Sequence, residues 1–341
     1  MKAITITKNE AGQRLDKMLS KYLNLAGKGF LYKMMRKKNI TLNGKKCDGS
    51  ERLTEGDQVK LFLSDETIEK FSQVHIQKVS KQSLHIVYED ENVLFINKPA
   101  GMLSQKAKDT DESLVEYILD YLLTSRQLKE EELKSFRPSV CNRLDRNTSG
   151  LVAAGKTLAG LQGLSQLFRN RNLHKYYHCL VKGQVKERCR IKGFLKKDEK
   201  TNQVSISKEE TDGSLPIETE YTPLAAGEDF TLLQVLLITG RSHQIRAHLA
   251  SIGHPIAGDP KYGDKKVNVY MKQKYGITAQ LLHSAVLVFP DMQPPLSNLS
   301  KITVSAPLPP LFEKAVKGEI NERKAAQEGR ETVWEHGIPE V

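Results

Sequence analysis

A short apolar run in the middle of the chain, Leu151-Val152-Ala153-Ala154, is bounded by glycines at positions 150 and 155. Its length and its glycine borders predict a buried β-strand. Thr157 follows at a position suited to capping a helix, and the apolar side chains after it recur at helical spacing. These side chains are Leu158, Leu161, Leu164, Leu167 and Phe168. The sequence therefore predicts a strand followed directly by a helix.

The loop before that strand carries one carboxylate between two guanidinium groups. Asp145 lies between Arg143 and Arg146, in the run Cys-Asn-Arg-Leu-Asp-Arg-Asn-Thr-Ser-Gly at 141–150. Side chains on a loop that is held by regular elements often do chemical work. Locally, the same pattern is more typical of a turn-forming or salt-bridged surface aspartate. The rest of the chain decides between these interpretations.

The composition points to a polyanionic partner. The chain has 341 residues, enough for two domains, and a net charge of +11, which favours nucleic acid ahead of an anionic membrane. No apolar run is long enough to span a bilayer, and the N-terminus lacks the apolar core of a signal peptide. The cysteines show no zinc-ligand spacing, and they indicate reduced, buried thiols and a cytoplasmic location. They are Cys47, Cys141, Cys179 and Cys189.

Residues 1–63 carry most of the net charge, with 14 Lys and Arg against 6 Asp and Glu. Apolar stripes predict helices around 15–23 and 30–35, and short strands are expected at 40–42 and 59–63, with Asn43-Gly44 as a turn. A basic helix followed by a hairpin is suited to a phosphate backbone, although a charge run is more often only a solvated face. The basic side chains in question are Arg14, Lys33, Arg36, Lys37 and Lys38.

The chain after this segment divides into a linker, a large domain and a tail. Residues 64–83 are polar without periodicity, which predicts a linker. Strands are expected at 86–88, 93–96, 176–181, 191–195, 204–207, 217–223 and 232–238, and a helix at 112–133. The polar segment 196–214 predicts a flexible hairpin. From about residue 312 the sequence predicts a charged, weakly helical tail that contains Trp334.

A third run, Gly-Arg-Ser-His-Gln-Ile-Arg-Ala-His-Leu at 240–249, follows the expected strand at 232–238. Ser242 is suited to capping a helix there. A strand, a glycine and a helix N-terminus can form a phosphate or carboxylate site, although an ordinary connection has the same pattern. His243 and His248 are five residues apart and lack the H-E-x-x-H pattern of zinc enzymes, so we expect hydrogen-bonding or core roles and no metal site.

Four ordered runs resemble the RluA family of pseudouridine synthases. They are N-K-P-A-G-M at 97–102, R-L-D-R-N-T-S-G-L at 143–151, K-Y-Y-H-C-L-V-K-G at 175–183, and G-R-S-H-Q-I-R-A-H with P-I-A-G-D-P-K-Y-G within 240–263. Residues 1–63 are similar to the RNA-binding module first described in ribosomal small-subunit protein S-four. The resemblance implies an α+β fold, with a mixed, largely antiparallel sheet, flanking helices and a central cleft. It places the catalytic domain at 84–311 and a small α/β RNA-binding module before it.

The resemblance also implies roles for individual residues. Asp145 matches the single catalytic aspartate of the family, Tyr177 the aromatic residue at the target base, and Arg246 the arginine that pairs with the aspartate. Further RNA contacts are expected from Arg143, Arg241 and His243, beside the basic side chains of the N-terminal module. Asn142 stands where the family usually has His. On the local pattern alone, Tyr177 is more typical of a strand core residue.

The implied reaction fits these residue types. Converting uridine to pseudouridine needs no redox change, phosphate transfer or group donor, so we expect no cofactor and no metal. An ionised carboxylate can act as a nucleophile or as a base, and the residues leave both routes open. The favoured interpretation is a monomeric RNA-uridine isomerase that acts on large-subunit ribosomal RNA, with no membrane partner. The alternatives are a non-catalytic RNA-binding ribosome-assembly factor and a small-molecule hydrolase that uses Asp145.

Overall fold

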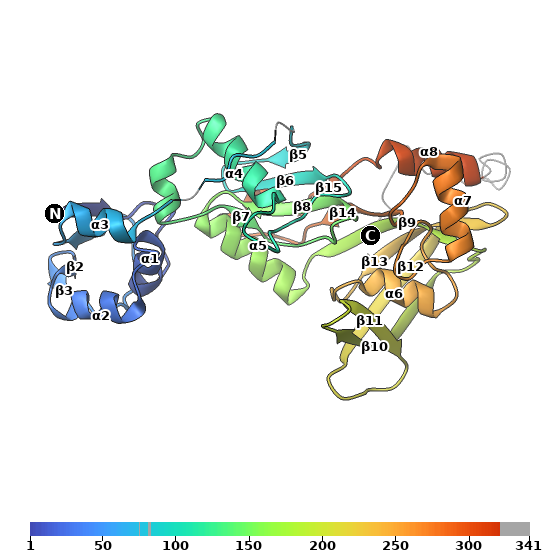
Figure 1. The fold of residues 1–341 in the computed structure, drawn as a ribbon, viewed down its shortest axis with the longest axis horizontal. Helices are drawn as coiled ribbons and strands as arrows, with labels where there is room; N and C mark the ends of the chain where they lie inside the picture. Colours follow the sequence, from blue (N-terminus) through green and yellow to red (C-terminus); the bar gives the residue numbers. More distant parts are fainter. Residues whose placement is uncertain (75, 81–82, 321–341) are drawn as a thin grey trace.

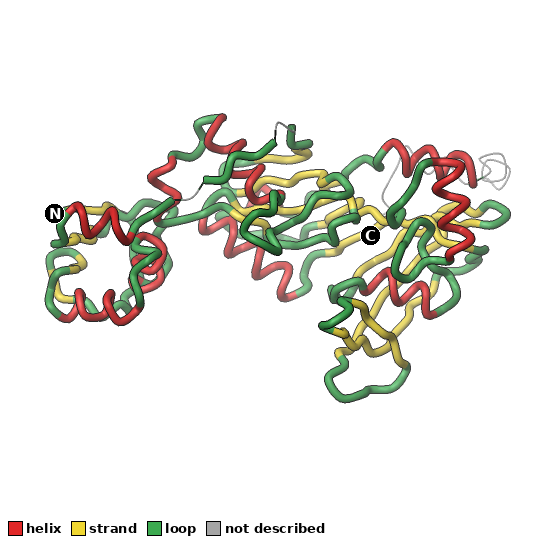
Figure 2. Tube along the Cα trace, in the orientation of Figure 1, coloured by secondary structure: helices red, strands yellow, loops and turns green. Residues whose placement is uncertain are grey.

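The computed structural model describes residues 1–74, 76–80 and 83–320. An N-terminal unit with a small sheet lies beside a larger body built on one long sheet (Figure 1). Helices lie along both sheets, and loops join the elements (Figure 2). The expected α+β fold with a largely antiparallel sheet is confirmed. None of the helices in the described ranges is both long and apolar enough to span a bilayer.

The N-terminal unit folds around the two predicted helical stripes. Its sheet has the order β1-β4-β2-β3, and every pairing in it is antiparallel. Leu15, Leu19 and Met35 are buried in its core. The elements are β1 (Lys2–Thr5), α1 (Leu15–Tyr22), α2 (Lys28–Arg36), β2 (Ile40–Leu42), β3 (Lys45–Lys46), β4 (Gln58–Leu61) and α3 (Asp65–Phe71).

Two parts of the segment expected to be a linker, 64–83, pack against the folded units. Helix α3 is capped by Ser64, whose hydroxyl accepts from the Thr67 N–H at 3.2 Å, and Ile68 is buried in the core of the N-terminal unit. Farther along, Val74 and Ile76 pack against the core of the larger body. A helix of seven residues with one buried side chain shows little apolar periodicity, so the sequence did not predict it.

A buried hydrogen bond also joins the two units. The Ser135 hydroxyl donates to Glu10 Oε1 at 2.5 Å, and both side chains are buried. The Glu10 carboxylate also accepts from the Thr7 N–H at 2.9 Å, so it is fixed within its own unit. The N-terminal unit therefore contacts the larger body through a specific polar contact.

In the described part of the chain the large sheet has 11 strands. Its main path is β11-β10-β12-β13-β9-β14-β8-β6-β5, with β15 beside β14 and β7 beside β8, and only the β8–β14 pairing is parallel. The strands are β5 (Ile86–Glu89), β6 (Val93–Lys98), β7 (Ser139–Val140), β8 (Ser149–Gly155), β9 (His174–Lys182), β10 (Cys189–Asp198), β11 (Gln203–Ser207), β12 (Leu215–Ala226), β13 (Phe230–Leu237), β14 (Leu282–Val288) and β15 (Thr303–Ser305). All the predicted strand positions are confirmed.

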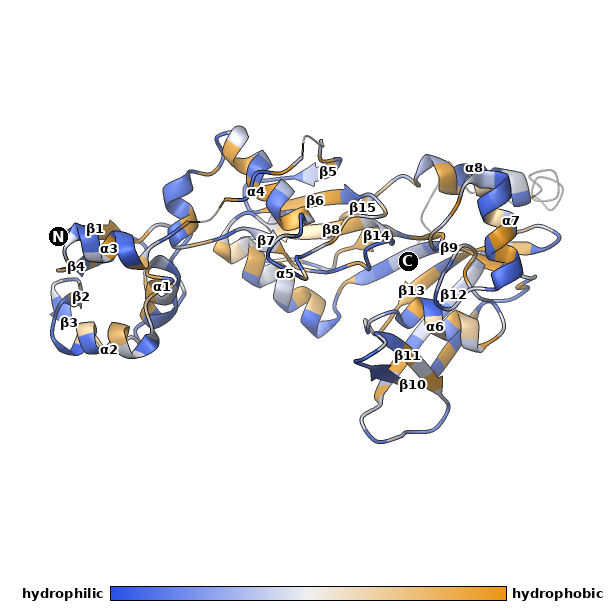
Figure 3. Cartoon of the chain, in the orientation of Figure 1, coloured by the Kyte–Doolittle hydropathy of each residue, from blue (hydrophilic) through white to orange (hydrophobic). Residues whose placement is uncertain are grey.

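Helices cover both faces of this sheet. Along β6, Leu94 and Ile96 pack in the core that includes α4, whereas Val93 and Phe95 pack in the core that includes α5. This alternation places the two helices on opposite faces of this part of the sheet. Strands β6 and β8 are mostly hydrophobic (Figure 3). The helices are α4 (Leu114–Thr124), η1 (Glu130–Lys134), α5 (Leu158–Asn170), α6 (Gln244–Ser251), α7 (Lys265–Tyr275), η2 (Ser297–Leu299) and α8 (Pro310–Glu319).

Three local predictions need correction. The helix expected at 112–133 ends at Thr124, because Arg126 takes the left-handed conformation and the N–H groups of Gln127 and Leu128 return to the Leu122 carbonyl. The charged tail expected from residue 312 begins as α8, whose Phe312 side chain is buried in a core with α7, while Trp334 lies outside the described residues. Among the cysteines expected to be buried, Cys189 is exposed.

Candidate active site

The loop that carries Asp145 runs from β7 to β8 and is anchored beside the carboxylate. Leu144 is buried, and its N–H donates to the Ser104 hydroxyl, which in turn donates to the Leu144 carbonyl, both at 3.0 Å. The Thr148 N–H donates to the Asp145 carbonyl at 3.0 Å and closes the turn. The backbone of Asp145 is therefore fixed on both sides.

A fully buried lysine, Lys98 at the end of β6, joins this loop to the chain after β6. Its ammonium donates to the carbonyls of Pro99 and Met102, both at 2.9 Å, and of Arg146 at 3.2 Å. Burial lowers the pKa of Lys98 to about 7, and the Asp145 carboxylate opposes that shift. Sequence reasoning assigned no role to Lys98, although the N-K-P-A-G-M run contains it.

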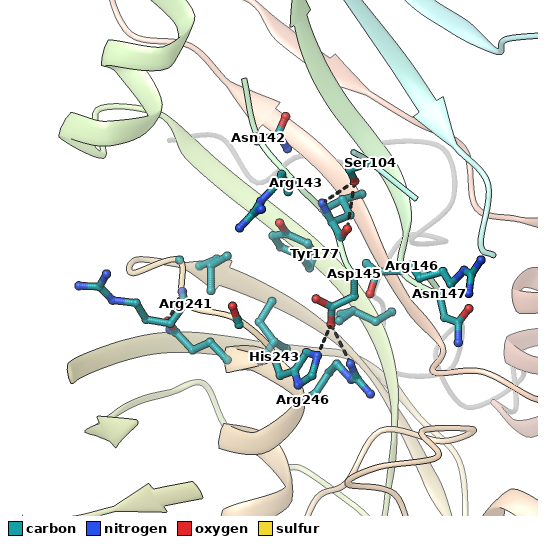
Figure 4. Close-up of a pocket in the computed structure, with 18 of the residues that line it drawn as sticks. Ser104, Asn142, Arg143, Asp145, Arg146, Asn147, Tyr177, Arg241, His243 and Arg246 are labelled. Carbon is teal, nitrogen blue, oxygen red and sulfur yellow. Dashed lines mark hydrogen bonds and ion pairs between the residues drawn. The ribbon is translucent and has the colours of Figure 1, made fainter. Parts of the chain in front are cut away.

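Asn142 pairs with the backbone of β8. Its amide N–H donates to the Leu151 carbonyl at 3.2 Å, and its oxygen accepts from the Ala153 N–H at 2.8 Å. Figure 4 shows the Asn142 side chain well away from Asp145. Both polar ends of this amide are therefore used to hold the start of the loop against the sheet.

Helix α6 brings Arg246 to the carboxylate. The prediction that Ser242 caps this helix is wrong, because His243 is the N-cap residue, with a φ of 54° and no side-chain cap. The Gln244 side chain accepts from the Arg241 N–H at 3.1 Å and orders the turn instead. Arg246 lies in the first turn of the helix, and its Nη1 donates to Asp145 Oδ2 at 2.8 Å.

A second carboxylate holds Arg246 in place. Asp259 is fully buried and accepts from Arg246 Nε at 2.7 Å and from Nη2 at 2.9 Å. Burial opposes the charge on Arg246, but the hydrogen bonds to Asp259 and the charge of Asp145 raise the pKa of the guanidinium. The ring of Tyr262 lies 5.2 Å from the guanidinium carbon. Arg246 is thus a fixed cation, aimed at Asp145.

His243 is the other neighbour of the carboxylate. Its Nε2 lies 3.8 Å from Asp145 Oδ2, and its Nδ1 shares a hydrogen bond with the Tyr262 hydroxyl at 2.9 Å. Burial lowers the pKa of His243, although Asp145 opposes the shift, so the imidazole is neutral at pH 7. The side chains of His243 and Arg246 both converge on Asp145 (Figure 4). In the described ranges, no group of His, Cys, Asp or Glu side chains is arranged to hold a metal ion.

Asp145, His243 and Arg246 line a cavity of about 920 Å³, a size that accommodates a nucleotide. Tyr177 enters it from β9 and is 7% exposed, and burial raises its pKa to about 12, so the phenol is neutral. The Asp145 side chain is 28% exposed, so it remains accessible from the cavity. The structure brings together all six residues predicted for the cleft, which are Asp145, Tyr177, Arg246, Arg143, Arg241 and His243.

The five basic residues predicted on the N-terminal unit do not line this cavity. Arg14, Lys33, Arg36, Lys37 and Lys38 are all exposed on that unit, which lies to one side of the larger body (Figure 1). The Arg14 guanidinium also donates to both oxygens of Asp16, at 3.1 and 3.0 Å.

Four residues that matter to the site were not predicted. Lys98, Asp259 and Tyr262 support the Asp145 loop or Arg246, and Lys175 lines the cavity. Each belongs to a run that the sequence analysis quoted, but only the folded chain shows which side chains reach the site.

The comparisons with known proteins agree with this geometry. Residues 92–251 match the sequence profile of the family described as RNA pseudouridylate synthase. The chain is 31% identical over 326 residues to ribosomal large subunit pseudouridine synthase C of Vibrio parahaemolyticus, covering 92% of this chain and 95% of the relative. It is 30% identical over 303 residues to the protein of that name in Escherichia coli K12, covering 85% and 88%.

The fold is also found among solved structures. Human RNA pseudouridylate synthase domain containing 1 superposes with a TM-score of 0.54 and 22% identity, over 75% of this chain and 98% of that one. At that identity the likeness concerns the fold alone. The two sequence relatives are about 30% identical to this chain and align over most of the length of both chains. The chain therefore belongs to the RluA family of RNA pseudouridine synthases.

Proposed function

We propose that this enzyme isomerises uridine to pseudouridine in large-subunit ribosomal RNA and that Asp145 is its catalytic carboxylate. The observation that carries the proposal is the 2.8 Å pair between Asp145 and Arg246 at a cavity of nucleotide size. The names of the relatives support the ribosomal substrate. The net charge of +11 supports a polyanionic one.

The reaction moves the base from one attachment to another. The bond from the uracil N1 to the sugar C1′ breaks, the base turns, and C5 forms the new bond to C1′. The proton on C5 leaves, and N1 gains a proton, so no electrons enter or leave. Asp145 starts this sequence as an anion, either as a nucleophile or as a base that removes a proton from the sugar. Arg246 serves both routes because its positive charge favours the ionised carboxylate.

The base has to leave the RNA stack before Asp145 can reach it. Tyr177 offers a buried, neutral ring in the cavity, and we assign it the contact with the extruded base. Arg143 and Arg241 line the same cavity and are suited to the phosphates beside that base. Nε of Arg241 is buried and has no hydrogen-bond partner in the described residues.

The N-terminal unit places the RNA, in our proposal, without taking part in the chemistry. The exposed basic side chains of α2 and the residues after it, Lys33, Arg36, Lys37 and Lys38, supply the affinity. We further propose that the enzyme works in the cytoplasm and that it is a monomer. Light scattering across a concentration series tests the assembly state.

The substrate is tested by mapping pseudouridine in the RNA of a deletion strain and its parent. We expect specific large-subunit positions to revert to uridine and to be restored by a plasmid copy. Loss confined to transfer RNA would refute the ribosomal substrate. An unchanged map would favour the alternative of a non-catalytic assembly factor.

A further inference from the structure

Lys175, the second residue of β9, is a buried cation for which the reaction as described has no use. Its side chain lines the active-site cavity, and the residue is only 8% exposed. No carboxylate pairs with it in the described ranges, and the charged neighbour that acts on it is a cation, Arg171. Removing most of a lysine from water beside a second cation, with no counter-ion, is unfavourable for the charged side chain.

The position of Lys175 relates it to the residue assigned to the base. It lies two residues before Tyr177 on the same strand, so both side chains leave the same side of β9, roughly 7 Å apart. Both line the cavity. A nucleotide whose base rests on Tyr177 therefore has its backbone within reach of the Lys175 ammonium.

Arg171 adds a second charge at the same place. It follows α5 as the C-cap residue, with a φ of 60°, and its exposed side chain lines the cavity. Burial lowers the pKa of Lys175, and the charge of Arg171 lowers it further. The two cations therefore repel each other in the free protein.

Each cation has an ordinary explanation when it is taken alone. A basic side chain at a helix C-terminus is favoured by the helix dipole, which accounts for Arg171. A lysine can lay its stem on apolar surface and keep its ammonium in water, and the mostly buried Lys175 does so where its side chain lines the active-site cavity. Neither explanation accounts for two neighbouring cations that line the active-site cavity with no carboxylate between them in the described residues.

We propose that Lys175 and Arg171 form a binding site for a backbone phosphate of the RNA, adjacent to the nucleotide whose base contacts Tyr177. The proposal rests on RNA entering this cavity, as in the proposed function. A backbone phosphate offers two non-bridging acceptor oxygens and one negative charge, which matches two neighbouring cations at the cavity that have no carboxylate partner in the described residues. Lys175 is then a positioning residue that holds the target nucleotide in place through its adjacent phosphate, and Asp145 is the catalytic residue.

The test compares Lys175→Met, Lys175→Arg and Lys186→Met in the full chain. Lys186 is exposed on the chain after β9 and does not line the cavity, so its variant removes the same charge elsewhere. Binding of a fluorescein-labelled ten-residue oligouridylate is measured by anisotropy across a salt series. We expect Lys175→Met to bind about tenfold more weakly. Its log-log salt slope is expected to be shallower by about 0.7 for the one lost contact.

Lys175→Arg keeps the charge and should retain most of the affinity, whereas Lys186→Met should behave like the parent. Single-turnover isomerisation of transcribed ribosomal RNA forms the second arm, where Lys175→Met should raise the half-saturating concentration and leave the saturating rate nearly unchanged. Equal affinity and slope for Lys175→Met and the parent would overturn the proposal. The proposal would also be overturned if Lys175→Arg lost as much RNA affinity as Lys175→Met and both variants had a lowered melting temperature. Because oligouridylate binding needs no turnover, it reports on this site even if isomerisation fails.

Discussion

Removing the carboxylate behind Arg246 should destabilise the protein more than any other isosteric change at the site. Asp259→Asn keeps the shape of a side chain that is fully buried and accepts from two guanidinium nitrogens and the N–H groups of Lys261 and Tyr262. Breaking a buried ion pair from one side costs about 3–5 kcal/mol of unfolding free energy. Arg246 keeps its bond to Asp145 at 2.8 Å, which puts the expected cost near the lower end, at about 3 kcal/mol.

Calorimetry and urea unfolding at neutral pH measure this loss of unfolding free energy from the unfolding transition of the larger body. The expected drop in melting temperature is about 6–10 °C for a domain of this size. Asp291→Asn is the matched control, because Asp291 is 66% exposed and its ion pair with Lys301, at 3.5 Å, is screened by water and should contribute little. If Asp259→Asn lost no more stability than this control, the bidentate pair would not be what holds Arg246.

The pH dependence of the same pair has a definite sign. Burial opposes the charge on Asp259, but hydrogen bonds from Arg246 keep its pKa below the ordinary value of 3.8. As pH falls below that value, the unfolded chain takes up a proton that the folded chain does not, and stability is lost through the folded pKa. Asp259→Asn lacks this linkage. The stability gap between parent and variant should therefore narrow from about pH 5 towards pH 2, and a constant gap would contradict the assignment.

Three further predictions concern the loop, the N-terminal unit and metal. Lys98→Met removes the donor that joins the Asp145 loop to the chain after β6, so kcat should fall about 10- to 100-fold with a smaller change in KM; a change confined to KM would contradict this. Reversing Arg36, Lys37 and Lys38 to Glu should weaken RNA binding and flatten its salt dependence, whereas an unchanged slope would mean that this face is only solvated. Activity should survive dialysis against EDTA, and its restoration by zinc after loss would refute a metal-free mechanism.

Much of the fold could be predicted because the spacing of apolar residues indicates which face of a helix or strand is buried. Apolar spacing and turn residues were enough to predict the strand at 151–154 and the helix that begins at Leu15. The end of α4 could not be found in this way. It depends on the left-handed turn at Arg126, which no glycine or proline marks. Nor does the sequence show that α3 packs on the N-terminal unit, since it does so through only two apolar side chains, the buried Ile68 and Phe71, whose ring lies 4.9 Å from that of Phe30.

The proposed catalytic residues could be predicted from the sequence, but the residues that support them could not. Asp145, Tyr177 and Arg246 could be placed by resemblance, because each belongs to a run of characteristic residues. Their supports could not, since Asp259 lies 13 residues from Arg246 and the register of the chain after α6 decides whether they meet. Lys175 was missed for a different reason: its type suggests a solvated surface, and only the folded structure shows it buried.

The claim that the Asp145 carboxylate starts the reaction is tested most directly by release of tritium from C5-labelled uridine in transcribed large-subunit ribosomal RNA. Asp145→Asn removes the charge and preserves the shape, and Asp291→Asn makes the same change at an exposed position. We predict that the parent and Asp291→Asn release tritium. We expect Asp145→Asn to bind the RNA and stay folded but to release none. Release by Asp145→Asn at a rate near that of the parent would contradict the central role of this carboxylate.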